Sequence, residues 1–159
     1  MSKYTFVDLS QPLFNGIPLA PILPRFHMYP CLELRTADTV NCNAAIITDH
    51  TGTHCDAPCH VLPDGKSIDQ LPVDLPRILP KPRKKIKATG IDFGGPDPLG
   101  GSKHICHEIL LSNDVYIIES LCNLDQIVGK EVTFLAFPLK FEGFSGAPTR
   151  AVAMLEKTE

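Results

Sequence analysis

Residues 49–60 read Asp49-His50-Thr51-Gly52-Thr53-His54-Cys55-Asp56-Ala57-Pro58-Cys59-His60. This segment holds three of the six histidines of the chain, and two more, His104 and His107, lie together further on. Histidines that only filled a core would be scattered rather than clustered. Because imidazole and carboxylate ligands together suit Zn, Mn or Fe, we interpret this segment as a source of metal ligands.

A helix is disfavoured over this segment by Gly52 and Pro58. In an extended chain alternate residues share one face, so His50, His54 and Asp56 project in the same direction. A straight strand would nevertheless separate the backbones of His50 and Asp56 by about 20 Å, whereas a metal ion holds its ligand atoms at about 2.0 to 2.2 Å. We therefore predict a bend at Gly52, with His50, His54 and Asp56 as the first ligands.

His60 follows Pro58, which takes the chain out of a regular strand, so His60 can reach the same site from another direction. A histidine beside a metal that is not itself a ligand is suited to move protons, because its ordinary pKa of about 6.5 allows both protonation states at neutral pH. We predict this catalytic role for His60. The alternative is a histidine in a surface loop.

A structural zinc site made of Cys55, Cys59 and two histidines is another interpretation of the same segment. Structural zinc sites pair closely spaced cysteines with a second ligand pair further along the chain, and that downstream pair is missing here. In a strand, Cys55 and Cys59 would also point away from the face that carries the histidines. A structural zinc site is therefore disfavoured.

One convincing helical pattern spans Lys103–Ser112, where apolar residues recur every three or four positions at Ile105, Cys106, Ile109 and Leu110. This helix offers His104, His107 and Glu108 as candidate site residues. Glu119 closes the next apolar run, and an ionised carboxylate at the end of a buried strand needs a partner. That partner is either a metal or a Lys or Arg side chain, and the pattern alone does not decide.

Strand patterns outnumber this one helix. β-Branched and apolar residues mark strands at Tyr4–Leu9, Ala44–Thr48, Val115–Ile118, Val132–Phe137 and Ala151–Leu155. The 159 residues are 43% hydrophobic and 21% charged, which is typical of one soluble domain spanning residues 1–159.

Charge and hydropathy argue against two classes of partner. The formal net charge of -3 offers no general attraction for nucleic acid, whose binding depends on Lys and Arg neutralising phosphates. No stretch approaches the roughly 20 apolar residues of a membrane span, and the first residues lack the apolar core of a signal peptide. We therefore expect a cytoplasmic protein with reduced thiols that binds neither nucleic acid nor membranes.

Residues 76–100 are rich in Pro, Gly and charge, and we interpret them as a connector. The basic run Lys81–Lys87 is of a kind that can bind phosphate. Pro82 interrupts the run, however, and no aromatic residues are interleaved for base stacking. A solvated connector is the preferred interpretation.

The pattern His50-x-Gly52-Thr53-His54-x-Asp56-Ala57-Pro58-x-His60 resembles the signature of the metal-dependent kynurenine formamidase and putative cyclase family. Shorter matches follow in the family's order at Val7–Ser10, Pro12–Leu13, Asn123–Asp125, Pro138–Lys140, Glu142–Gly143 and Pro148–Val152. The resemblance covers most of the chain and rests mainly on the histidine pattern. The chain is shorter than family members between about Leu79 and Gly90, where they have a strand, a helix and a strand.

The resemblance implies a strand-rich α/β fold of the swivelling β/β/α type, with part of the usual core missing. By position, His50, His54 and Asp56 would hold one metal ion, and Asp56 would bridge to a second ion held by His107 and Glu119. The resemblance also implies that the ions are zinc or manganese, that His60 is the acid/base and that the protein is a homo-oligomer.

Two functional hypotheses follow. The first is a metal-dependent hydrolase that uses a metal-activated water on a small formamide or cyclic amide similar to N-formylkynurenine. The alternative is a shortened, non-catalytic relative that binds metal and serves as a binding or regulatory subunit. The complete set of matched ligands favours the enzyme, and the missing segment favours the relative.

Overall fold

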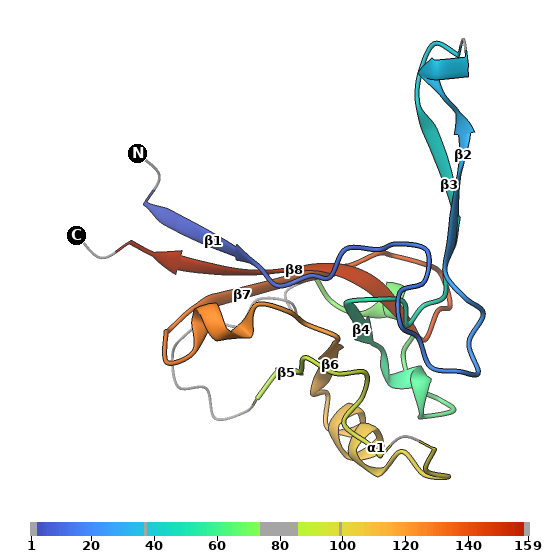
Figure 1. Ribbon diagram of the computed structural model, residues 1–159. Coiled ribbons are helices and arrows are strands. Elements are labelled where there is room, and N and C mark those ends of the chain that lie inside the picture. Colours follow the sequence, from blue (N-terminus) through green and yellow to red (C-terminus); the bar gives the residue numbers. More distant parts are fainter. Residues whose placement is uncertain (1–2, 37, 74–85, 99, 158–159) are drawn as a thin grey trace.

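The computed structural model describes residues 3–36, 38–73, 86–98 and 100–157. Its centre is a six-stranded sheet in the order β1-β8-β4-β6-β5, with β7 also paired to β8 (Figure 1). The strands of this sheet are β1 (Tyr4–Asp8), β4 (His54–Asp56), β5 (Ala88–Gly90), β6 (Tyr116–Glu119), β7 (Thr133–Pro138) and β8 (Gly146–Glu156). Only β5 and β6 pair in parallel, and the other pairs of this sheet are antiparallel.

The remaining elements are short. They are a hairpin of β2 (His27–Leu32) and β3 (Cys42–Ile46), one α-helix, α1 (Ile105–Ser112), and four 3-10 turns, η1 (Leu34–Thr36), η2 (Pro58–His60), η3 (Ile68–Gln70) and η4 (Leu124–Ile127). Strands thus outweigh helices among the described residues, as the sequence predicts. None of the helices in this part of the chain is long and apolar enough to cross a membrane.

The long strand β8 joins the two halves of the sheet. Its first residues pair with β4, and its later residues pair with β1 and β7. Three alanines of β8 that face the core, Ala147, Ala151 and Ala153, are completely buried. Their small side chains let neighbouring elements pack closely against the strand.

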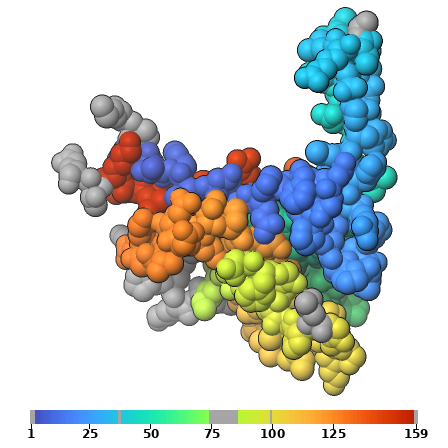
Figure 2. Space-filling model, viewed as in Figure 1, coloured from blue at the N-terminus to red at the C-terminus, as the bar shows by residue number. Residues whose placement is uncertain are grey.

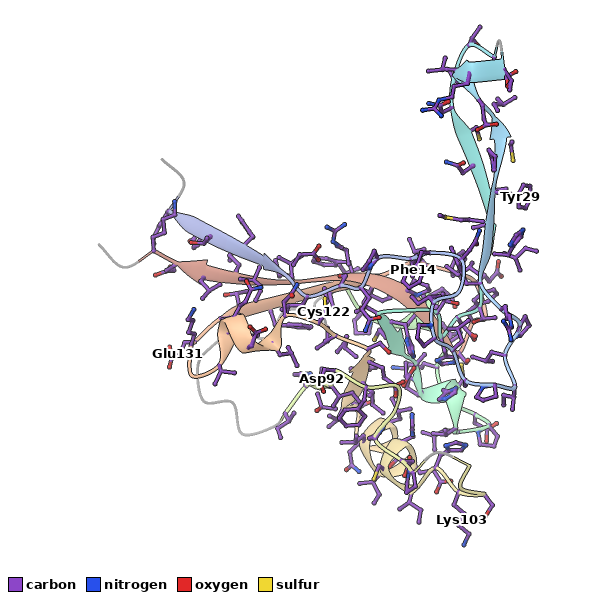
Figure 3. The ribbon with its side chains drawn as sticks, viewed as in Figure 1. Phe14, Tyr29, Asp92, Lys103, Cys122 and Glu131 are labelled. Carbon is purple, nitrogen blue, oxygen red and sulfur yellow. The ribbon has the colours of Figure 1, made fainter. Side chains whose placement is uncertain are left out.

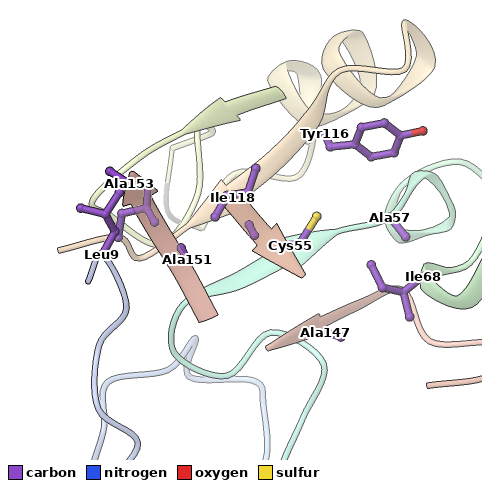
Figure 4. Packing of buried hydrophobic residues seen from close by; sticks show 11 residues of the cluster. Leu9, Cys55, Ala57, Ile68, Tyr116, Ile118, Ala147, Ala151 and Ala153 are labelled. Atoms are coloured by element: carbon purple, nitrogen blue, oxygen red, sulfur yellow. The ribbon is translucent and has the colours of Figure 1, made fainter. Parts of the chain in front are cut away.

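The hydrophobic core lies on one face of the β4–β6 pair (Figure 4). Cys55 of β4 and Tyr116 and Ile118 of β6 point into it, where they meet Leu9 and Ile68. Because side chains alternate along a strand, the neighbours of Cys55 in β4 point to the opposite face. The polar site is therefore built on the reverse side of the core.

The predicted helix is present, but it begins at Ile105 and buries a different face from the one expected. His107 and Leu111 are its buried residues, whereas Ile105 and Ile109 are 53% and 59% exposed. The apolar spacing that identified the helix therefore does not identify its packed side. Leu111 is buried, and His107 contacts the sheet through Glu119 of β6.

The hairpin of β2 and β3, which we call the arm, projects away from the body (Figures 1 and 2). Every residue of β2 is exposed. Apolar side chains on the arm include Met28, Tyr29 and Ile46, which are 42%, 46% and 57% exposed. The sequence predicted a strand near β3 but gave no sign of β2, because the arm has no buried face and hence no alternation of polar and apolar residues.

Part of the predicted connector lies outside the described residues, namely residues 76–85 with most of the basic run. In the remaining part, Ala88–Gly90 forms β5 and pairs with Tyr116–Ile118 of β6, so the predicted connector is interrupted by a strand. The prediction of a single domain over residues 1–159 stays a prediction.

We predict that Leu9→Ala lowers the free energy of unfolding by about 2 to 5 kcal/mol, because Leu9 is completely buried and its truncation leaves a cavity. Urea unfolding of the metal-free protein measures the change. Phe6→Ala on β1 is the control, since Phe6 is 58% exposed. Equal losses in the two variants would show that Leu9 is not part of the core.

Candidate metal centre

The pairing of β4 with β6 sets the centre of the candidate site. His54 lies directly opposite Glu119 in the register, and opposed residues of an antiparallel pair share a face. Asp56 shares the face of His54 because it lies two positions along the strand. His54, Asp56 and Glu119 are only 3%, 0% and 5% exposed. The sheet therefore buries two carboxylates and an imidazole side by side.

His50 joins this group through the bend that the sequence predicts at Gly52. Gly52 has a φ of +62°, a left-handed conformation that favours glycine. A side chain at this position would also meet Leu13, since a Cβ would lie 2.5 Å from Leu13 Cδ2. The bend brings His50 Nδ1 to 2.9 Å from Asp56 Oδ1.

His107 reaches the site from α1, which leads through a tight turn into β6. Its Nε2 lies 3.2 Å from Glu119 Oε1 and 3.6 Å from Asp56 Oδ2. Of the other candidates on this helix, His104 and Glu108 are exposed. His107 and Glu119 are thus brought to the centre of the site, and His104 and Glu108 are not.

Three groups of potential ligands lie in the described part of the chain, and the ligand atoms within each group lie within 4.8 Å of one another. Two of the groups share Asp56: His50, His54 and Asp56 form one, and Asp56, His107 and Glu119 form the other. The third group, Asp97, His104 and His107, lies on the outer side of His107 and includes the exposed His104. Oδ1 of Asp56 faces His50 and His54, whereas its Oδ2 faces His107. This geometry is that of two adjacent cation positions joined by one carboxylate.

Two buried atoms test whether a cation fits here. His54 Nε2 and Asp56 Oδ2 have no hydrogen-bond partner among the described residues, and buried polar atoms are normally paired. Both atoms belong to the ligand groups. Nitrogen and carboxylate-oxygen donors are ordinary ligands of divalent metals, so the residues present fit a divalent metal ion.

Each of the three imidazoles is also held from outside the site through its other ring nitrogen. The outer partners are Ser145 Oγ at 3.0 Å from His50 Nε2, the Gly52 carbonyl at 2.8 Å from His54 Nδ1 and Asp97 Oδ2 at 2.6 Å from His107 Nδ1. Ser145 in turn donates to Asp49. Metal-binding histidines typically have such partners, which orient the ring.

The buried charges shift one another's pKa values in the metal-free site. Burial alone would raise the pKa of Asp56, but the His50 and His54 contacts hold it well below its usual range. Burial likewise opposes the charged form of His54, yet Asp56 and Glu119 raise its pKa to about 10. The pKa of His107 rises to about 9 because hydrogen bonds to Glu119 and Asp97 outweigh its burial. Metal binding must therefore displace protons from these rings.

His60 lies beside the ligands without being tied to them. Its ring centroid is 4.1 Å from that of His50 and 5.4 Å from that of His107. None of the described residues forms a hydrogen bond with its ring. Burial and the neighbouring His50 lower the pKa of His60 to about 4, so its imidazole is neutral near pH 7.

The rival cysteine site is not assembled in the described part of the chain. Cys55 is buried in the core on the opposite face of β4, and Cys59 donates weakly to the Phe144 carbonyl. Neither cysteine belongs to a group of potential ligands there.

Asp97 and Ser145 are the site residues that sequence reasoning missed. Asp97 lies within the segment predicted as a connector, and Ser145 precedes β8 without any motif around it. Their contacts join segments far apart in the chain, such as Ser145 with His50. No local spacing could have revealed these contacts.

Known proteins resemble this chain in sequence over its first part. Residues 7–79 match the family model described as putative cyclase. A kynurenine formamidase of Paracidovorax citrulli is 31% identical over 102 residues, which cover 64% of this chain and 44% of that protein. A kynurenine formamidase of Bacillus cereus is 35% identical over 75 residues, which cover 47% of this chain and 36% of that protein. The match thus spans less than half the length of these relatives.

Solved structures resemble the whole fold. Isatin hydrolase A from Labrenzia aggregata has a TM-score of 0.80 at 20% identity, with 98% of this chain and 95% of that chain covered. A predicted metal-dependent hydrolase from Bacillus stearothermophilus has a TM-score of 0.74 at 22% identity, with 96% and 99% covered. These structures confirm the predicted strand-rich α/β fold, and the sequence matches confirm the resemblance to the kynurenine formamidase and putative cyclase family.

We predict that Asp56→Asn removes more metal than His107→Ala. Two cations a few ångströms apart repel each other unless an anion lies between them, and Asn keeps the shape of Asp without its charge. Wild-type protein should bind up to two metal ions per chain, His107→Ala about one and Asp56→Asn the fewest. Elemental analysis after dialysis against Zn²⁺ or Mn²⁺ measures the number of metal ions bound per chain.

His27→Ala is the control for these variants, because His27 is exposed on the arm and should leave the metal content unchanged. Wild-type metal content in Asp56→Asn would contradict the shared role of Asp56.

Proposed function

From the match of residues 7–79 to the putative cyclase family, we propose that the protein is a metal-dependent hydrolase that cleaves an amide bond of a small molecule. The observation that carries the proposal is the position of Asp56 between two groups of potential ligands. Hydrolases recur among the similar proteins, as kynurenine formamidases and as an isatin hydrolase. The non-catalytic alternative is not favoured, because the predicted ligands lie together beside His60.

The cofactor in this proposal is a pair of divalent metal ions, zinc or manganese. His50, His54 and Asp56 would hold one ion, and Asp56, His107 and Glu119 the other. A bound divalent ion lowers the pKa of water and polarises a carbonyl oxygen of the substrate. The buried carboxylates compensate the charge of the ions.

His60 is the proposed catalytic residue. Its neutral ring, free of hydrogen bonds to the described residues, can accept a proton from the attacking water as the oxygen bonds to the carbonyl carbon. When the carbon–nitrogen bond breaks, His60 returns that proton to the leaving nitrogen. The products are a carboxylic acid and an amine, and the imidazole is regenerated.

The proposed substrate is a small formamide such as N-formylkynurenine, or a cyclic amide. The names of the relatives support both, since isatin hydrolase acts on isatin and kynurenine formamidase on a formamide of kynurenine. Metal analysis combined with hydrolysis assays on N-formylkynurenine and isatin tests the function. Bound metal without turnover of either amide would favour the non-catalytic alternative.

We further propose that two copies of the chain associate through the arm. The strands β2 and β3 contain no Asp, Glu, Lys or Arg, and an isolated two-stranded hairpin is only marginally stable in water. Most soluble oligomers pair identical subunits, so a second copy is the proposed occupant of this surface.

His60→Ala should keep the metal and lose about 10²- to 10⁴-fold in kcat, because that is the usual contribution of general acid/base catalysis. Steady-state kinetics on the best amide substrate and metal analysis of the same sample measure the two effects. His27→Ala is the control, since His27 is exposed on the arm and belongs to none of the groups of potential ligands among the described residues. Unchanged turnover of His60→Ala would remove His60 from the mechanism.

Leu34→Lys should weaken self-association by about tenfold or more, because a charge would enter an apolar interface. Leu34 lies in the turn of the arm and is 56% exposed, so the substitution spares the fold. Sedimentation equilibrium measures the dissociation constant, with Val128→Lys, at an exposed apolar residue of the body, as the control. A monomeric wild-type protein at micromolar concentration would contradict the dimer.

A further inference from the structure

We infer that Asp97 is a positioning residue that holds the His107 ring with Nε2 facing Asp56 and Glu119. The inference rests on the proposed metal centre and does not depend on turnover. It concerns the second ligand group, made by Asp56, His107 and Glu119.

A single carboxylate fixes His107 at two points. Asp97 Oδ2 accepts a hydrogen bond of 2.6 Å from His107 Nδ1 and another of 3.1 Å from the His107 backbone N–H. Its Oδ1 accepts a hydrogen bond of 2.8 Å from the Cys106 backbone N–H. The side chain of Asp97 is only 5% exposed, so water competes little for these bonds. Both the ring and the backbone of His107 are therefore held.

The same contacts complete the start of α1. The first N–H groups of a helix have no partner within the helix, and the residue at its N-cap position, His104, provides no side-chain hydrogen bond. Asp97 supplies the missing acceptor from earlier in the segment that leads from β5 into α1, and its negative charge also suits the helix N-terminus. The point where α1 begins and the direction of the His107 ring are thus set by one residue.

The loop that carries Asp97 is anchored to the strand that carries Glu119. The Ile91 N–H donates to the Ile118 carbonyl at 2.9 Å, and the Ser120 N–H donates to the Phe93 carbonyl at 3.1 Å. These bonds flank Glu119 on both sides. These backbone hydrogen bonds fix the position of the loop, and hence of Asp97, relative to Glu119.

The hydrogen bond from Nδ1 to Asp97 decides which nitrogen of His107 is available to bind a metal ion. A carboxylate accepts the Nδ1 proton, so Nε2 is the nitrogen that can bind a cation. An anionic partner at Nδ1 also makes Nε2 a more basic, stronger ligand for a metal ion. The direct hydrogen-bond partners of His50 and His54 are neutral, the Ser145 hydroxyl and the Gly52 carbonyl, and the nearest carboxylate on that side of His50, Asp49, lies farther away at 3.7 Å. The effect of Asp97 should accordingly be confined to the second ligand group.

Asp97→Asn tests the inference, because it keeps the shape of Asp97 and removes its charge and one acceptor. Loss of such a partner typically weakens metal binding by about 10- to 100-fold, and we expect this loss at one of the two positions. Competition of Zn²⁺ against a chromophoric chelator measures the affinities. Asp92→Asn is the control, because Asp92 is an exposed carboxylate on the same loop (Figure 3). Wild-type affinities in Asp97→Asn would overturn the inference.

A double-mutant cycle separates positioning from a merely structural role. If Asp97 acts through His107, Asp97→Asn should have no further effect on zinc affinity in a His107→Ala background. An equal loss in both backgrounds would mean that Asp97 only stabilises the helix start, and would overturn the inference.

Nuclear magnetic resonance of ¹⁵N-labelled wild-type protein loaded with Zn²⁺ gives a test that needs no variant. We expect the His107 proton on Nδ1 and the zinc on Nε2. Zinc on Nδ1 would overturn the inference. A wild-type protein that binds no zinc would remove the metal centre itself, whereas zinc binding without amide hydrolysis would remove only the hydrolase proposal.

Discussion

The burial of two carboxylates beside each other is the constraint on which the site depends. Asp56 and Glu119 are 0% and 5% exposed, and an ionised carboxylate out of water is costly unless it is paired. The described residues place no Lys or Arg against them. Three imidazoles provide the compensation, and two polar atoms of the cluster still lack hydrogen bonds. Such a cluster is poorly suited to stabilising a fold and well suited to binding a cation.

The elements around these carboxylates are short, and they are stabilised by pairing and packing against one another. The β4–β6 register places His54 opposite Glu119, and the contact between α1 and β6 brings in His107. Gly146 allows β8 to approach, since a Cβ there would lie 2.8 Å from the Cys55 carbonyl oxygen and 3.0 Å from His50. Small residues of β8 thus allow close packing on both faces, the buried alanines on the core face and Gly146 beside His50.

Local pattern was enough to predict the features that depend on neighbouring residues. The bend at Gly52, the strands near β1, β6 and β7 and the existence of α1 follow from residue type and spacing. The buried side of α1 could not be predicted, because Ile109 fits a helical stripe yet lies outside. Asp97 was missed for a related reason: its partners are set by tertiary contacts, and nothing in its own loop differs from an ordinary turn.

The proposed ligands come from two segments of the chain that pair with each other. His50, His54 and Asp56 come from the segment around β4, and His107 and Glu119 come from α1 and β6, with pairing between β4 and β6 joining the two. A chain that matches less than half the length of its relatives can therefore keep every proposed ligand in place. In the proposed hydrolase, metal affinity would be set by β4, β6, α1 and the Asp97 contacts that hold His107, whereas the choice of substrate would depend on the residues that line the approach to His60.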